Sequence, residues 1–200
     1  MLQGKEMIGG NRVFAGRLVR NAMAVMLAGM LSAALSAEDG GNAKVSGLKN
    51  GSFETVVPYG KAKQKEWEIK DGRGPLNWSL LGPKGSLEVC KHPDGKSNYL
   101  KLSGGSIYQF YQGKAQSFQL RFKVAGKGVL NVRLLRQKPL PDGKRTGLPT
   151  KQLQRIEVDS PEWKDCAISC KLDSPDEFFA PVFACLEGSV SLDDVMVVPE

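Results

Sequence analysis

A succession of short apolar runs, separated by turns that contain glycine or proline, constrains this chain more than any other feature. From Pro75 onward the runs recur roughly every 8 to 12 residues, which is the sequence pattern of a β-sandwich. Within Phe118–Val124, apolar and polar side chains alternate, so that strand should bury one face and expose the other. Beyond the N-terminal apolar segment, no stretch has a convincing 3.6-residue period. The pattern therefore predicts an all-β domain.

The individual strands can be placed between the turn signals. They are expected at residues 76–81, 86–91, 98–102, 106–112, 116–125, 128–135, 154–158, 163–172, 178–186 and 190–198. In Ile107–Tyr111 and Phe178–Leu186, the side chains on both faces of the expected strand are largely apolar, which indicates central strands. Pro181 weakens this prediction for the second strand, because proline has no amide proton to donate to a neighbouring strand. Residues 139–150 hold three prolines and two glycines and should form a protruding loop.

The N-terminal segment has the pattern of a secretory signal peptide. Four basic residues precede an apolar run at Ala22–Leu35, and small residues at Ala34, Ser36 and Ala37 suit cleavage. The run is shorter than the roughly 20 residues of a comfortable membrane span, although an uncleaved anchor is the alternative. We expect a signal peptide at 1–37, a flexible lead-in at 38–47 and one domain at 48–200. The mature protein would then be secreted or periplasmic, with no membrane span.

The positive charge of the chain is concentrated in one window. The formal net charge is +7, and cleavage after Ala37 would leave +4. Residues 133–155 hold seven basic residues and one acid, Asp142, a local charge of +6. Such a window could attract an acidic glycan or an acidic partner, or it could be a solvated hairpin tip. No interleaved aromatics or known motif support nucleic-acid binding.

The four cysteines, Cys90, Cys166, Cys170 and Cys185, form an even set that is compatible with disulfides in an exported protein. Their spacing does not match a zinc site. In an extended strand Cys166 and Cys170 would lie about 13 Å apart. A disulfide needs Cα atoms within about 7 Å, so these two should not pair with each other.

Motifs at both ends of the domain carry a family resemblance. Asn50–Glu54 (NGSFE) joins a turn to a short strand whose Phe53 can face a core, and Val190–Val198 (VSLDDVMVV) is a closing strand. Between them lie the strand at 98–102 after the Pro93–Gly95 turn, the strand at 117–124, and Pro161–Lys164 (PEWK). In this order, the motifs resemble the galactose-binding-like β-sandwich of many carbohydrate-binding modules, over about Gly47–Pro199.

The resemblance implies a jelly-roll β-sandwich of two antiparallel sheets that binds a glycan or polysaccharide without catalysis. It also implies a structural calcium ion that ties the first strand to the last through Glu54 and Asp193. The alternative for Asp193–Asp194 is a hydrogen-bonded bulge without metal. Trp78 and Trp163 occupy core-like positions in the family, and we expect both to be structural.

Sugar recognition needs exposed aromatic faces together with polar groups. The candidate ligand-binding residues are Trp67, Tyr59, Tyr108, Tyr111, Lys144 and Arg145. Trp67 has charged neighbours and is expected to be the best exposed aromatic, while Lys144 and Arg145 would favour acidic glycans. The competing hypothesis is an envelope protein-interaction module with no sugar site. An enzyme is not expected, because the chain has one histidine and neither a nucleophile elbow nor a phosphate-binding loop.

Overall fold

The computed structural model describes residues 47–60, 67–82 and 84–200. The predicted signal peptide and nearly all of the lead-in lie outside the described residues. The elements are β1 (Val56–Pro58), β2 (Glu68–Ile69), the 3-10 turn η1 (Lys70–Gly72), β3 (Arg73–Pro75), β4 (Ser79–Leu81), β5 (Ser86–Lys91), β6 (Asn98–Ser103), β7 (Ser106–Tyr108), β8 (Ser117–Pro139), β9 (Arg145–Lys171) and β10 (Phe178–Pro199). The all-β prediction is confirmed. In the described part of the chain, no helix has the length and apolar character needed to cross a bilayer.

Three long antiparallel strands form the centre of the domain. β8 pairs with β10 on one side and with β9 on the other, nearly end to end. The sequence predicted each of these strands as two separate pieces, and this was wrong. The predicted loop at residues 139–150 is also shorter than expected, because β9 already begins at Arg145. Pro181 lies within β10, opposite Leu134 and one residue before the pairing with β7.

In the long strands, the glycines that indicated turns in the sequence lie at bends within continuous strands. The β8–β10 register shifts between Cys185 and Glu187, and the β8–β9 register shifts between Val124 and Gly126. Gly126 and Gly188 have φ angles of +117° and +67°, which L side chains rarely adopt. A Cβ on Gly188 would lie 2.2 Å from the carbonyl oxygen of Lys127. Glycine therefore lets the paired strands bend together without breaking the ladder.

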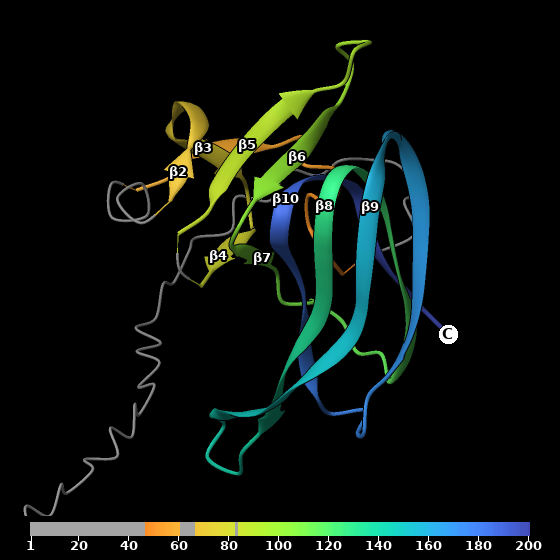
Figure 1. The fold of residues 1–200 in the computed structure, drawn as a ribbon. Coiled ribbons are helices and arrows are strands. Elements are labelled where there is room, and N and C mark those ends of the chain that lie inside the picture. The colour runs from red at the N-terminus through yellow and green to blue at the C-terminus, as the bar shows by residue number, and fades with distance from the viewer. Residues whose placement is uncertain (1–46, 61–66, 83) are drawn as a thin grey trace, which may run out of the picture. The chain divides into compact units, whose positions relative to one another are not determined.

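The bends fold the ladder over on itself and so create the sandwich (Figure 1). Phe118, at the start of β8, stacks on Phe179, at the start of β10, with ring centroids 4.4 Å apart. In register, however, Phe118 lies opposite Pro199 at the far end of β10. Phe122 and Phe183 also meet across the core, edge to face, with ring centroids 5.1 Å apart. Each such ring contributes about 1.5–3 kcal/mol through burial, which favours the folded ladder.

Short strands extend the two halves of the folded ladder. β6 pairs with the second half of β10, and β5 and then β2 continue that sheet. β7 pairs with the first half of β10, and β4 continues that side. β1 and β3 form a separate two-stranded sheet. The pairings are antiparallel except that of β2, which runs parallel to β5.

The Asn50–Glu54 motif meets the closing strand, as the sequence predicted. The amide of Val195 donates to the carbonyl of Gly51 at 3.0 Å. Phe53 is fully buried, but it lies in a turn with a φ of +58° rather than in a strand. Its ring contacts Trp78 at 5.4 Å, and the Trp78 indole N–H donates to the carbonyl of Asn50. The structural role predicted for Trp78 is therefore confirmed.

All four cysteines lie among the described residues, and none forms a disulfide. Cys166 and Cys170 lie four residues apart within the extended β9, as the strand prediction requires. Burial raises the pKa of the Cys170 thiol to about 11 and that of Cys166 in the same direction. Both thiols are thereby held in their less reactive protonated form.

Candidate functional site

An open depression of ≈ 410 Å³ lies on the outer face of the sheet that contains β6, the second half of β10 and the bend of β8 and β9. The strands place its lining residues through the two-residue alternation of side chains. Leu100, Leu102 and Leu192 point into the core, so Tyr99, Lys101 and Ser191 point outward. The described lining residues are Pro93, Tyr99, Lys101, Ala125, Gly126, Lys127, Pro161, Trp163, Ser189 and Ser191.

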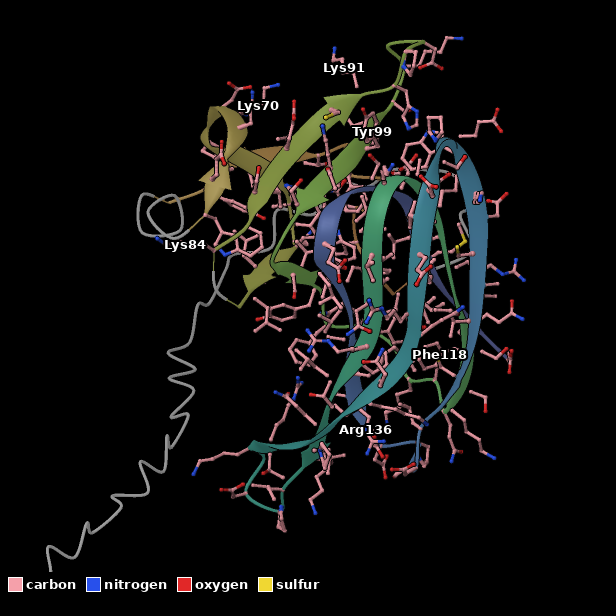
Figure 2. All side chains as sticks on the ribbon, viewed as in Figure 1. Lys70, Lys84, Lys91, Tyr99, Phe118 and Arg136 are labelled. Carbon is pink, nitrogen blue, oxygen red and sulfur yellow. The ribbon has the colours of Figure 1, made fainter. Side chains whose placement is uncertain are left out.

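Two aromatic side chains form one wall of this depression. The rings of Tyr99 and Trp163 meet edge to face, with centroids 5.4 Å apart, and both are partly exposed. His92 completes a triangle of rings, at 5.0 Å from Tyr99 and 5.2 Å from Trp163. Figure 2 shows Tyr99 on β6, toward the bend of β8 and β9. Aromatic rings that are partly exposed and braced by neighbours can present a flat apolar surface to a ligand.

Asp193 anchors this triangle of rings to β10. Its Oδ2 lies 3.0 Å from Nε2 of His92, and its Oδ1 accepts the amide proton of Asp194 at 2.7 Å. Burial raises the pKa of the Asp193 carboxyl, and the two hydrogen bonds partly offset that rise. Asp193 therefore holds the His92 ring in place behind Tyr99 and Trp163.

The floor of the depression is polar. Ser189 and Ser191 project from β10, and Gly126 contributes only backbone. The Ser189 hydroxyl oxygen is buried and has no hydrogen-bond partner among the described residues. A buried hydroxyl without a partner costs on the order of 1–3 kcal/mol of folding free energy, and this oxygen lies below the reach of a ligand in the depression.

The ligand-binding residues predicted from sequence lie on different elements and faces. Trp67 is only 3% exposed, so its predicted role as the best exposed aromatic is wrong. Its ring packs so closely on Gly105 that an added Cβ there would lie 2.2 Å from it. Tyr111 is also buried and stacks on Phe179 at 4.9 Å. Neither ring is available to a ligand, because both pack in the core against glycines that leave room for them.

Tyr59 and Tyr108 differ in how much of their surface is available. The Tyr59 hydroxyl donates to the carbonyl of Trp78 at 3.0 Å, and burial raises its pKa to about 12. Tyr108 is partly exposed on β7, edge to face with Phe110 at 6.0 Å. It lines a different depression, in the other half of the ladder, together with Gln109 and Gln112.

Lys144 and Arg145 lie at the β8–β9 hairpin tip. The Lys144 ammonium group is 3.1 Å from Asp142, and the Arg145 guanidinium carbon lies 3.6 Å from the centroid of the Phe178 ring. Two of the other five basic residues in the window also contact acids. Arg136 contacts Asp173 and Glu177, and Arg155 contacts Glu187. These three acids lie outside the window, so its charge of +6 falls to +3 when they are counted.

The predicted calcium ligands do not form a cation shell as they stand. Oε1 of Glu54 accepts the amide proton of Asn98 at 2.9 Å, while both carboxylate oxygens of Asp193 are engaged as described above. In the described part of the chain, no group of three or more metal-ligating side chains converges. Asp193 begins a bulge in β10, with Asp194 at a φ of +48°, which matches the alternative of a hydrogen-bonded bulge.

The sequence missed the residues that line the depression. Trp163 was expected in the core and is instead partly exposed at the wall. Its charged neighbours in Pro161–Lys164 were the available signal. Tyr99 alternates with Leu100 and Leu102, so its outward direction could have been derived from parity. That β6 and the bend of β9 meet could not be derived, because it depends on the folding of the ladder.

No protein-family description matches the sequence, and no curated protein matches it. Among solved structures, the chain is similar to the enzymatically active domain of tailspike protein 4 from bacteriophage CBA120, with 12% identity and a TM-score of 0.49. That match covers 76% of this chain and 21% of the tailspike chain. The chain is also similar to the CBM22-2 xylan-binding domain of Paenibacillus barcinonensis Xyn10C, with 15% identity, a TM-score of 0.46 and coverage of 62% and 92%.

A third similar structure is the family 11 carbohydrate-binding module of Clostridium thermocellum, solved with a β-1,3-1,4-linked tetrasaccharide. It shows 17% identity and a TM-score of 0.44, and the match covers 63% of this chain and 91% of the module. Likenesses at this level carry no conclusion about a ligand of this chain.

Proposed function

We propose that this chain is an exported, non-catalytic carbohydrate-binding domain, and that the depression lined by Tyr99 and Trp163 receives a sugar unit. The observation that carries the proposal is the pair of partly exposed rings in a depression whose lining also includes Ser191 and two lysines. A pyranose presents C–H patches to an aromatic face and hydroxyl groups to polar side chains. The wall and the floor together supply both kinds of contact.

The test is a glycan array with the mature domain, followed by calorimetry on the best ligands. Trp163→Ala should weaken binding by roughly 1–3 kcal/mol, because an aromatic face that contacts a ligand is lost. Tyr108→Ala, which removes a partly exposed ring from the other half of the ladder, is the matched control and should leave binding unchanged. Binding that survives Trp163→Ala, or that is lost in Tyr108→Ala instead, would place the sugar elsewhere.

Calcium binding by Glu54 and Asp193 remains a proposal that rests on the sequence resemblance alone. To bind an ion, Asp193 would have to release His92. If an ion is bound, calcium should raise the melting temperature, and Asp193→Ala should abolish the increase. Identical melts in calcium and in chelator would leave Asp193 solely as the anchor of His92.

A further inference from the structure

Two lysines frame the depression. Lys101 lies on β6, opposite Ser191, and Lys127 lies at the bend of β8, opposite Ser189. β10 lies between β6 and β8, so the two lysines are two strand spacings apart across the sheet, and their partners Ser191 and Ser189 are two residues apart along β10. Together these offsets separate the two lysine Cα atoms by about 12 Å, which is comparable to the length of two sugar units. Both residues line the depression, and their flexible side chains allow the ammonium groups to approach one ligand from two sides.

The positive charge at this place is only partly offset by its surroundings. The described lining residues include no Asp or Glu. Glu88 lies opposite Lys101 in register, but its carboxylate is bound to Lys70. Asp159 is 4.0 Å from Lys127, and their side chains are 84% and 90% exposed. Exposed pairs of this kind contribute little, so Lys127 stays available to a ligand.

We infer that the preferred ligand of this depression is an anionic glycan, in which a uronate carboxylate or a sulfate ester lies between Lys101 and Lys127. The inference deepens the proposed function and rests on it. The sugar ring packs on the wall formed by Tyr99 and Trp163, and its hydroxyl groups lie over the polar floor that includes Ser191. The sequence pattern assigned the preference for acidic glycans to Lys144 and Arg145 at the hairpin tip. The inference assigns it to Lys101 and Lys127 instead.

The experiment compares polymers whose backbones correspond but whose charge differs. Polygalacturonate is set against its methyl ester, and κ-carrageenan against desulfated κ-carrageenan, by affinity electrophoresis and calorimetry at low and high salt. We expect the anionic member of at least one pair to bind on the order of tenfold more tightly at low salt. The preference should shrink at 1 M salt, where the Debye length is about 3 Å.

The double substitution Lys101→Gln and Lys127→Gln should remove most of that preference, because it lowers the affinity for the anionic polymer much more than the affinity for the neutral polymer. Lys144→Gln with Arg145→Gln is the matched control, because it removes the same charge from the hairpin tip. The inference is overturned if the anionic and neutral members bind equally, or if the tip variant loses the preference. If no glycan binds at all, or Trp163→Ala has no effect, it is the proposed function that fails.

Discussion

The depression and the basic window at residues 133–155 carry positive charge in opposite ways. The window holds seven basic residues, yet Arg136, Lys144 and Arg155 contact acids and Arg145 lies over an aromatic ring. The depression holds only Lys101 and Lys127, but the described lining residues include no acid. The difference shows that the number of charges in a segment does not measure the charge it offers to a ligand. Acids that are distant in the sequence decide how much remains.

The strongest test of this comparison is the ion pair at Arg136 (Figure 2). Its side chain is 9% exposed, that of Glu177 is 4% exposed, and Nε and Oε2 lie 3.2 Å apart without hydrogen-bond alignment. Arg136→Ala should lower the free energy of unfolding by about 3–5 kcal/mol, because it leaves a buried carboxylate unpaired. Urea denaturation measures the change.

Arg136→Met combined with Glu177→Leu is the control, since apolar residues can replace a buried pair at little cost. The double variant should recover most of the lost stability. If Arg136→Ala changes stability by less than about 1 kcal/mol, the window is not held by its ion pairs, and the contrast with the depression fails.

A smaller effect is expected at the floor of the depression, with the opposite sign. Ser189→Ala removes a buried hydroxyl that has no partner, so stability should stay constant or rise by up to about 1 kcal/mol. Glycan affinity should stay unchanged, because the buried hydroxyl lies out of the reach of a ligand. Thermal melts and calorimetry on one preparation separate the two readouts. A clear loss of stability would mean that Ser189 already has a partner.

The smallest effect is expected at the hairpin tip. The Lys144 and Asp142 side chains are 80% and 53% exposed, so their ion pair should contribute little. Lys144→Gln should change the free energy of unfolding by less than about 0.5 kcal/mol at any salt concentration. A larger, salt-sensitive loss would show that the tip is structured by its charges, as the body of the window is.

The strand pattern and the two end motifs were enough to predict an all-β domain whose first motif meets its last strand. The alternation of side chains in residues 98–102 and 118–124 correctly separates core residues from surface residues, because this two-residue alternation is a local property of any strand. Trp78 was also assigned correctly. The long strands were divided wrongly, since Gly126 and Gly188 produce the same local signal in a bend as in a turn.

Which aromatic is available to a ligand was decided only by the tertiary structure. Trp67, between two glutamates in sequence, is buried because Gly105 leaves room for its ring, while Trp163 stays at the surface because β9 bends beside β6. Exposure depends on residues far away in the chain, and so does the pairing of each charge. The sequence by itself determined the strand content, the faces of the strands and the joining of the two ends. The folding of one ladder over itself decided where a ligand can bind.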